Sequence, residues 1–275
     1  MASCTNYAFP LFIVQLVVIV LSLSSSTSLF CVGLNAVHNV SAAGADWSDA
    51  GATWYGPPTG AGTDGGACGF GSSVRSPPLN SMVAAGGNSL FQGGEGCGAC
   101  YEVKCTSNPA CSGSPVTVVI ADQCPGGPCD AESAHFDLSG TAFGAMAKQG
   151  AADQLRAAGQ LQIQHRRVPC FYQGTTISFA VDAGSNQFYL AAVIEFENGD
   201  GELGYVEMKQ AANSDPWVPM QRSWGAQWKL NSGSALRAPL SFRLTSATSK
   251  RSVVAENVIP YGWTPGQTYW SNVNF

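Results

Sequence analysis

The chain has 275 residues, enough for one large or two small domains. Charged residues make up only 11% of the chain, the net charge is −5, and Lys and Arg are divided evenly, with six in residues 1–175 and seven in residues 176–275. A nucleic-acid-binding protein needs a basic face and is therefore excluded. Hydrophobic residues make up 45% of the chain, which excludes global disorder, and the low charge favours a partner with few charges.

The first residues are expected to form a targeting segment. Residues 11–23 are an apolar run of thirteen residues without charge, shorter than the roughly 20 of a spanning helix but within the length of a signal-peptide core. Small residues at positions 31 and 33 favour cleavage after Gly33, so residues 1–33 are interpreted as a signal peptide; the alternative is a short membrane anchor. Export implies an oxidising, extracellular compartment and makes Asn39, in an Asn-Val-Ser sequence, a glycosylation site.

Cysteines divide the chain into two parts. Cleavage after Gly33 removes two of the ten cysteines and leaves eight, all between positions 68 and 170. This predicts an N-terminal domain held by disulfides and a C-terminal domain without them. Cys97 and Cys100 are three positions apart, which is the spacing of half a zinc site or of a redox motif. A zinc site would need a second pair with matching spacing, but Cys124 and Cys129 are five positions apart. Disulfides are therefore favoured in an exported chain, although eight cysteines leave the pairing open.

The first part reads as a small β-barrel with helical insertions. Residues 44–98 are rich in Gly and Pro and are predicted to be loops. Strands are expected at residues 101–105, 116–121 and 161–168, and short helices at residues 141–148 and 151–158. Ser139 or Thr141 could cap the first helix, and Gly150 and Gly159 could end the two helices.

The pattern changes after residues 169–175, a predicted linker. Strands separated by turns are expected at residues 176–182, 188–197, 201–211, 240–247 and 252–259, which is typical of a β-sandwich. The sequence Asn-Gly-Asp-Gly at residues 198–201 predicts a hairpin between two of these strands. Tyr189, Trp224 and Trp228 are candidates for an exposed aromatic strip. Of these, Trp224 is favoured as exposed and Trp228 as core, because Trp228 lies within a Trp-Lys-Leu strand pattern.

Two carboxylates and an aromatic pair could carry chemistry. Asp137 precedes a predicted helix, where it is either a helix cap or a general acid whose pKa burial raises. Asp122 ends a predicted strand and is either a site residue or a turn-forming side chain. Trp54 and Tyr55 precede a Gly-Pro-Pro loop, and aromatic planes can cover the apolar face of a sugar ring; one of the two is expected in the core.

Taken together, the ordered motifs resemble those of plant expansins, and most closely the β-expansins, which include the group-1 grass-pollen allergens. The matching segments are residues 53–56, 65–69, 96–101, 115–120, 124–127, 135–144, 167–170, 184–186 and 220–225. The resemblance implies a mainly β protein, in which a six-stranded double-psi β-barrel similar to family-45 endoglucanases precedes an immunoglobulin-like β-sandwich. It implies an N-terminal extension and the start of the barrel at residues 34–64, the barrel proper at residues 65–173, and a polysaccharide-binding sandwich at residues 188–270, with one long groove shared by both domains.

The resemblance also implies disulfides and site residues. The implied disulfides are Cys68–Cys97, Cys100–Cys170 and Cys105–Cys111, and the two remaining cysteines suggest a fourth, Cys124–Cys129. The implied catalytic-like acids are Asp122 and Asp137. The implied polysaccharide-binding residues are Thr53, Trp54, Tyr55 and His135 in the barrel and Tyr189, Ser223 and Trp224 in the sandwich.

Asp137 occupies the place of the endoglucanases' catalytic acid, but Gly56 stands where those enzymes carry the base, and Asp64 is only nearby in sequence. The resemblance therefore implies a secreted, monomeric plant cell-wall protein that loosens the wall without hydrolysis. Its expected partners are xylan-type matrix glycans and cellulose, and no cofactor or metal is expected. The alternatives are a weak endoglucanase, a passive wall-binding protein and a barwin-like defence protein.

Overall fold

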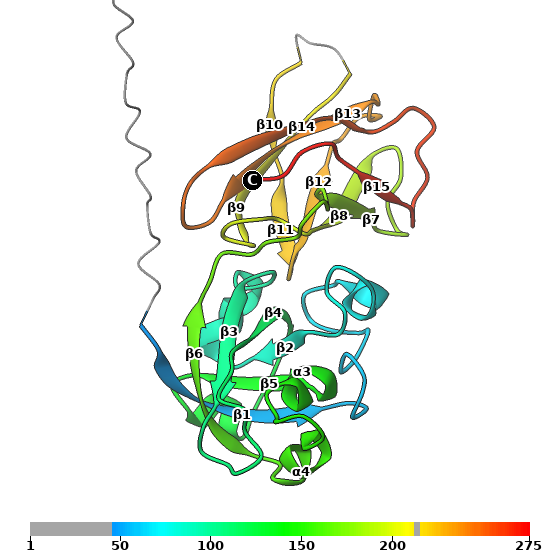
Figure 1. Cartoon of the computed structure of the whole chain (residues 1–275). Coiled ribbons are helices and arrows are strands. Elements are labelled where there is room, and N and C mark those ends of the chain that lie inside the picture. The colour runs from blue at the N-terminus through cyan, green and yellow to red at the C-terminus, as the bar shows by residue number, and fades with distance from the viewer. Residues whose placement is uncertain (1–45, 212–214) are drawn as a thin grey trace, which may run out of the picture. The chain divides into compact units, whose positions relative to one another are not determined.

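The computed structural model describes residues 46–211 and 215–275, so the predicted signal peptide at residues 1–33 and the predicted glycosylation site Asn39 lie outside the described residues. The residues from position 46 onward belong to one compact unit (Figure 1). Within the described ranges, no helix is long and apolar enough to cross a membrane.

Six strands close into a barrel in the order β1-β5-β2-β4-β3-β6. They are β1 Ser48–Tyr55, β2 Val83–Gly86, β3 Cys100–Cys105, β4 Val116–Gln123, β5 His135–Ser139 and β6 Leu161–Arg167. The three strands predicted near residues 101–105, 116–121 and 161–168 are confirmed as β3, β4 and β6. The Gly-rich residues 44–98, expected to be loops, contain β1 and β2, because small residues there pack where larger side chains would not fit.

The parallel pair of β1 and β5 determines the layout of the first candidate site. Thr53 lies opposite Asp137, and Gly51 lies opposite His135. Because alternate residues of a strand point to the same face, residues 51 and 53 of β1 share a face with residues 135 and 137 of β5. The barrel thus brings together side chains that are more than 80 positions apart in sequence.

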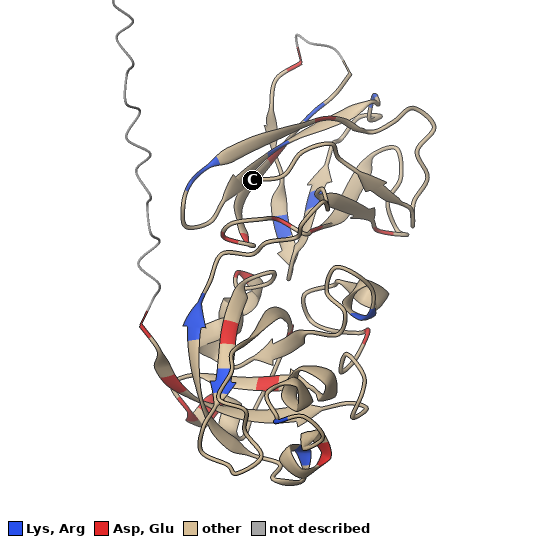
Figure 2. Ribbon diagram, in the orientation of Figure 1, with Lys and Arg blue, Asp and Glu red and all other residues tan. Residues whose placement is uncertain are grey.

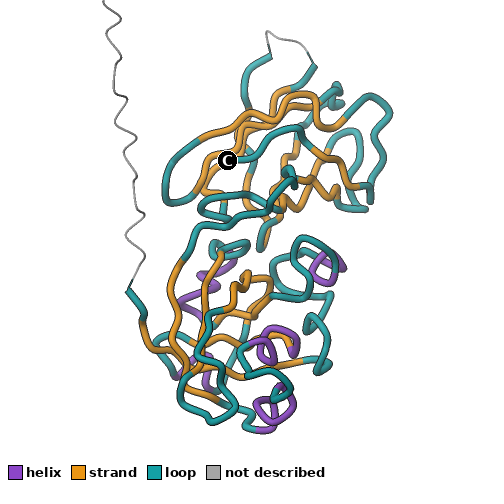
Figure 3. Tube along the Cα trace, viewed as in Figure 1, coloured by secondary structure: helices purple, strands orange, loops and turns teal. Residues whose placement is uncertain are grey.

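Short helices accompany only the barrel strands, and the second half of the described chain is strand and loop (Figure 3). The short helices are η1 Gly71–Arg75, α1 Asn88–Phe91, η2 Gln92–Gly94, α2 Pro128–Ala131, α3 Gly140–Ala145 and α4 Ala152–Ala157. The predicted helices near residues 141–148 and 151–158 are confirmed as α3 and α4. Gly159, with φ 70°, follows the end of α4, as expected. Helix α3 ends at Ala145, so Gly150 lies beyond its end and does not terminate it.

Ser139 is the N-cap of α3. Its Oγ accepts a hydrogen bond from Ala142 N at 3.0 Å and donates one to Ser81 O. We expect Ser139→Ala to lower the free energy of unfolding by about 1 kcal/mol, since a helix donor loses its partner. Thermal or denaturant unfolding measures this change. Thr141→Ala is the control, because Thr141 has no such capping bond, and an equal loss in both variants would contradict the assignment.

The second half forms two sheets, in the orders β10-β9-β13-β14 and β11-β12-β8-β7-β15. Their strands are β7 Ser178–Val181, β8 Tyr189–Glu195, β9 Leu203–Lys209, β10 Val218–Pro219, β11 Gln221–Trp224, β12 Gln227–Asn231, β13 Leu240–Ser246, β14 Ser252–Ile259 and β15 Thr268–Trp270. Phe179 of β7 and Phe242 of β13 meet with ring centroids 4.6 Å apart, which joins the two sheets through a common core. Trp228 is buried in this core as predicted.

The predicted hairpin at residues 198–201 is wrong. Strand β8 lies between β12 and β7 in the five-stranded sheet, whereas β9 pairs with β10 and β13 in the other sheet. Both edges of β8 are therefore occupied, and the chain must cross to the second sheet. Gly199 and Gly201 do make a turn, each with φ 75°. Turn residues specify a reversal of the chain but not which sheet receives the next strand.

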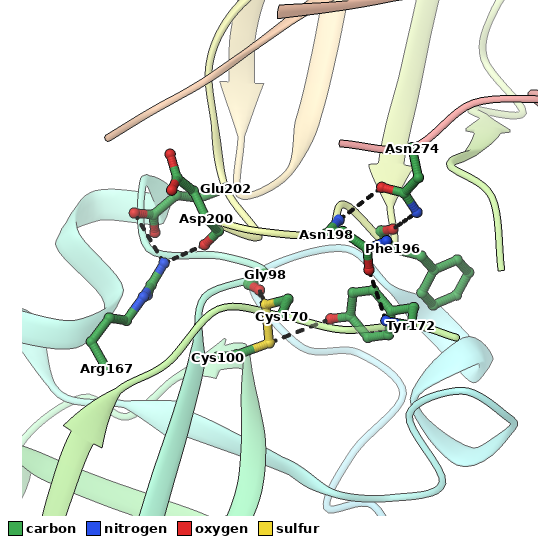
Figure 4. Close-up of a disulfide and its surroundings, with 10 residues drawn as sticks. All are labelled: Gly98, Cys100, Arg167, Cys170, Tyr172, Phe196, Asn198, Asp200, Glu202 and Asn274. Atoms are coloured by element: carbon green, nitrogen blue, oxygen red, sulfur yellow. Dashed lines mark hydrogen bonds and ion pairs between the residues drawn. A yellow bond between two sulfur atoms is a disulfide. The ribbon is translucent and has the colours of Figure 1, made fainter. Parts of the chain in front are cut away.

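The three implied disulfides, Cys68–Cys97, Cys100–Cys170 and Cys105–Cys111, are present, and so is the suggested fourth, Cys124–Cys129. Cys170 is also where the chain leaves the barrel. Its backbone exchanges two hydrogen bonds with Gly199, at 2.8 and 3.0 Å. The turn at residues 198–201 therefore pairs with the linker between the two domains. Nearby, Arg167 at the end of β6 reaches Glu202 at 3.2 Å (Figure 4).

Candidate functional site

The first candidate site lies on one face of β1 and β5. Thr53 Oγ1 donates a hydrogen bond of 2.7 Å to Asp137 Oδ1. Both side chains are partly buried, so the carboxyl group is close to solvent but not free in it. Asp137 is not the helix cap that its position also allowed, because Ser139 performs that function.

Burial raises the pKa of Asp137 above its ordinary value. The hydrogen bond from Thr53 and the nearby His135 lower the pKa, and the negative charge of Asp122 raises it, but burial is the largest effect. Asp137 therefore holds its proton to a higher pH than a free aspartic acid does. This is the property expected of a group that donates a proton or a hydrogen bond in mildly acidic solution.

Asp122, at the end of β4, is held by backbone donors. Its Oδ1 accepts hydrogen bonds from Ala67 N at 2.7 Å and from Gln123 N at 2.8 Å. Its Oδ2 accepts a longer bond, 3.4 Å, from the hydroxyl of Tyr55. Burial, followed by the charges of Asp122 and Asp137, raises the pKa of Tyr55, so its hydroxyl stays protonated. Asp122 therefore fixes the 66–69 loop and orients Tyr55 beside Asp137.

Trp54 and His135 are separated from this surface. Trp54 lies between Thr53 and Tyr55 and so points to the other face of β1, where its Nε1 donates to Arg156 O at 3.1 Å and its ring packs near Phe143. Of the two aromatics, Trp54 is thus the one that joins the packing. His135 was expected to bind polysaccharide, but its side chain is fully buried. It cannot touch a polymer and contacts Thr53 instead, with Nε2 2.9 Å from Oγ1.

Sequence reasoning missed Glu132. Its Oε2 lies 2.8 Å from His135 Nδ1, on the opposite side of the ring from Thr53. The contact depends on Gly51, because a Cβ at that position would lie 1.7 Å from Glu132 Oε2. The three-residue spacing of Glu132 and His135 is visible in the sequence, but the space left by Gly51 appears only when β1 pairs with β5.

The second candidate surface lies on the five-stranded sheet. Trp224 on β11 has 47% of its surface exposed, as predicted, while Tyr189 on β8 and Ser223 on β11 are partly exposed. Trp224 also approaches the barrel, since a Cβ at Gly69 would lie 2.8 Å from its ring. Gly69 belongs to the loop that Asp122 fixes through Ala67. This loop therefore contacts both candidate surfaces.

Comparisons with known proteins agree with this architecture. The DPBB_1 family model, described as lytic transglycolase, matches residues 83–165, and the model described as the expansin C-terminal domain matches residues 177–260. Expansin-B11 of Oryza sativa subsp. japonica is 59% identical over 83% of this chain and 78% of its own length. Expansin-B4 of Arabidopsis thaliana is 53% identical over 93% of this chain and 96% of its own length.

The chain belongs to the expansin family. Family membership confirms the activity that the motifs imply, loosening of the cell wall without hydrolysis, and it does not favour the endoglucanase alternative. It also supports a location in the plant cell wall.

Solved structures confirm the fold of this expansin. The apo crystal structure of the Clavibacter michiganensis expansin has a TM-score of 0.61 and 23% identity, and the match covers 83% of this chain and 98% of that one. A variant of the same bacterial protein, in complex with cellohexaose, matches with a TM-score of 0.61 and 24% identity over the same shares of the two chains.

Neither of the two positions considered above for a base offers a free carboxylate in this expansin. Gly56 has no side chain to offer, and Asp64 forms an ion pair of 2.6 Å with Arg75. Among residues 46–211 and 215–275, no cluster of three or more His, Cys, Asp or Glu side chains is arranged to hold a metal ion. Lys and Arg are scattered and do not form a basic face in the view of Figure 2.

A hollow of about 690 Å³ lies elsewhere, in the sandwich of this expansin. Its lining includes Asn186, Arg237, Tyr261 and Trp263 but none of the predicted site residues. The expected long groove across both domains is therefore not this hollow. We place the candidate site by its carboxylates and exposed aromatics rather than by the size of a cavity.

Proposed function

We propose that this expansin binds a wall polysaccharide on the surface formed by Thr53, Tyr55, Asp122 and Asp137 and on the sandwich surface around Trp224. Asp137, protonated at acidic pH, then donates a hydrogen bond to a glycosidic or hydroxyl oxygen of the polymer. The observation that carries this proposal is a partly buried carboxyl, held by Thr53 and with a raised pKa. A donor of this kind, without a base, binds a glycan but does not cleave it.

Loosening then follows from competition between hydrogen bonds. A polymer held by Asp137 and stacked on exposed aromatics gives up hydrogen bonds to its neighbours in the wall. Each contact is weak, but contacts along one polymer act together, so their combined effect is large. Under turgor the released polymers slide, and the wall extends without a covalent bond being broken.

Several further features are part of the proposal. The polymers are xylan-type matrix glycans and cellulose, since the low charge of the chain favours an uncharged ligand and the related bacterial structure contains cellohexaose. Residues 1–33 direct secretion, Asn39 carries a glycan if it remains after cleavage, and the protein acts as a monomer. Allergenicity is not part of the proposal.

Trp224→Ala tests the sandwich surface. We expect it to weaken binding to insoluble xylan and cellulose about fivefold to tenfold, since truncating an exposed aromatic anchor typically costs about 1 kcal/mol or more. Depletion isotherms on washed polymer measure the loss. Tyr205→Ala is the matched control, because Tyr205 is 45% exposed but lies on β9 of the other sheet. Equal binding of the Trp224 variant and the parent protein would reject this surface.

A further inference from the structure

Three loops of the sandwich enclose the hollow of about 690 Å³. They are the loop between β7 and β8, which contains Gln187, the loop between β12 and β13, which contains residues 236–238, and the loop between β14 and β15, which contains residues 261–265. The first two are joined directly, because Leu236 N donates a hydrogen bond of 2.7 Å to Gln187 O. The volume is within the range of sites that hold a small molecule, about 300–1,000 Å³. The hollow is therefore preformed and large enough for a ligand.

Two aromatic side chains border the hollow in different ways. Trp263 is half-buried and packs against the sandwich core, so its ring is held in place. Tyr261 is 76% exposed. It lies in a turn in which Trp263 N donates to Pro260 O at 3.3 Å and Gly262 has φ 71°, the positive value that a type II turn requires at its third position. The turn thus presents the Tyr261 ring to solvent beside the hollow.

The charges around the hollow balance one another. Among the described residues that line it, only Arg237 is charged, and its Nη2 donates a hydrogen bond of 2.8 Å to Asp215 Oδ2. The pair is neutral as a whole, yet 62% of the Arg237 side chain remains exposed and can donate to a ligand. The amide of Gln187 adds groups that donate and accept. This lining favours a ligand with hydroxyl groups over a charged ligand.

We propose that this hollow is a second sugar-binding site of the sandwich and holds a neutral sugar residue at an end or branch of a matrix glycan. The apolar face of the sugar ring lies on the Tyr261 ring, and its hydroxyl groups bond to Arg237 and Gln187. A hollow enclosed by loops accepts a short group, whereas the sheet surface at Trp224 suits an extended chain. The proposal rests on the proposed function only in that its ligand is a wall glycan.

The hollow and Trp224 lie toward opposite ends of β8. Trp224 pairs with Gln227 of β12, which in turn lies opposite Val193 of β8. Tyr189, at the start of β8, exchanges backbone hydrogen bonds with Asn186, which lines the hollow. Tyr189 and Val193 are four positions apart on an extended strand, about 13 Å. The two sites are therefore separate contacts, and one polymer that occupies both gains avidity.

Titration with xylotriose, a short neutral sugar, tests the hollow by proton–nitrogen NMR. We expect the amide signal of Gly262 and the indole signal of Trp263 to shift, and the indole signal of Trp224 to shift less. Tyr261→Ala should weaken xylotriose binding about fivefold, because the sugar loses its stacking partner. Phe171→Ala is the matched control and should bind like the parent protein: Phe171 is also 76% exposed but does not line the hollow.

Xylotriose that carries a glucuronic acid branch tests the preference for a neutral sugar. The parent protein should bind it no more tightly than xylotriose, because Asp215 offsets the charge of Arg237. Asp215→Asn keeps the shape and removes this charge, so we expect its affinity for the acidic sugar to rise about threefold and its affinity for xylotriose to change by less than about twofold. Tighter binding of the acidic sugar by the parent protein would contradict the neutral assignment.

Two results would overturn the site itself. One is an unchanged xylotriose affinity in Tyr261→Ala, and the other is a titration that leaves the Gly262 and Trp263 signals in place. Thermal unfolding of Tyr261→Ala at the parent temperature would show that a loss of binding is not a loss of fold. A failure of the proposed function looks different: Trp224→Ala would then bind insoluble polymer as the parent protein does, and Asp137→Asn would keep full creep, while xylotriose binding in the hollow stays the same.

Discussion

Asp137→Asn is expected to slow wall creep about tenfold at acidic pH and to leave little pH dependence. The parent carboxyl is protonated below its raised pKa, so its hydrogen bond to the polymer is present at low pH and is lost as the pH rises through that value. An amide neither titrates nor donates as strongly as a carboxylic acid. Loss of about 1.4 kcal/mol of interaction corresponds to a factor of ten in rate. Constant-load extension of heat-killed grass-wall strips over a pH series measures this.

Unfolding is not expected to explain the loss. Burial raises the pKa of Asp137 in the folded state, so the folded protein favours the neutral carboxyl. Its stabilising contribution is complete below the unfolded-state pKa and is lost as the pH rises through the folded-state pKa. The Asn variant lacks this titration and should melt at the parent temperature or above it at neutral pH. Full creep of the variant at every pH would remove Asp137 from the mechanism.

Removing the Cys100–Cys170 disulfide is expected to lower the free energy of unfolding by about 4 kcal/mol, because the bond closes a long loop. Its cysteines are 70 positions apart, and both are buried. The linker beside Cys170 also pairs with Gly199, so we expect the loss to loosen the region where the chain passes from the barrel to the sandwich (Figure 4). Denaturant unfolding of the Cys100→Ala, Cys170→Ala double variant measures the change.

The matched comparison uses the same chemistry on a short loop. Cys105 and Cys111 are only 6 positions apart, and their replacement by Ala should cost about 2 kcal/mol on the same chain-entropy reasoning. The order of the two losses is the prediction. A larger loss for the short loop would show that strain or local packing, rather than closure of the long loop, governs the contribution of Cys100–Cys170.

Local pattern predicted the strands whose side chains alternate clearly. It predicted β3, β4 and β6 of the barrel and β7, β8, β9, β13 and β14 of the sandwich, and the Trp-Lys-Leu pattern placed Trp228 in the core. It failed for β1 and β2, where Gly and Ala lack the side chains that mark a strand. It also missed β5 and the short sandwich strands β10, β11 and β15. It also failed at residues 198–201, because the sheet that receives β9 depends on which edges of β8 are already paired.

The candidate site was predictable only in part, because strands far apart in the sequence assemble it. The resemblance to expansins pointed to Thr53, Tyr55, Asp122 and Asp137, and the structure brings these residues together through β1, β4 and β5. It also pointed to His135 as a ligand-binding residue, although its ring is fully buried. The contact between Glu132 and that ring depends on empty space at Gly51 on another strand. No sequence window contains this information, because parallel pairing joins segments far apart in the chain.

The measurement that tests the central claim most directly combines two readouts in one bath. Heat-killed grass-wall strips are held under constant load at acidic pH with the protein or its Asp137→Asn variant, and reducing sugars are assayed in the surrounding solution. Non-hydrolytic loosening predicts creep with the parent protein, little creep with the variant and no sugar release with either. Sugar release that rises in step with creep would contradict it and would identify a missing base, with Asp64 the first to replace.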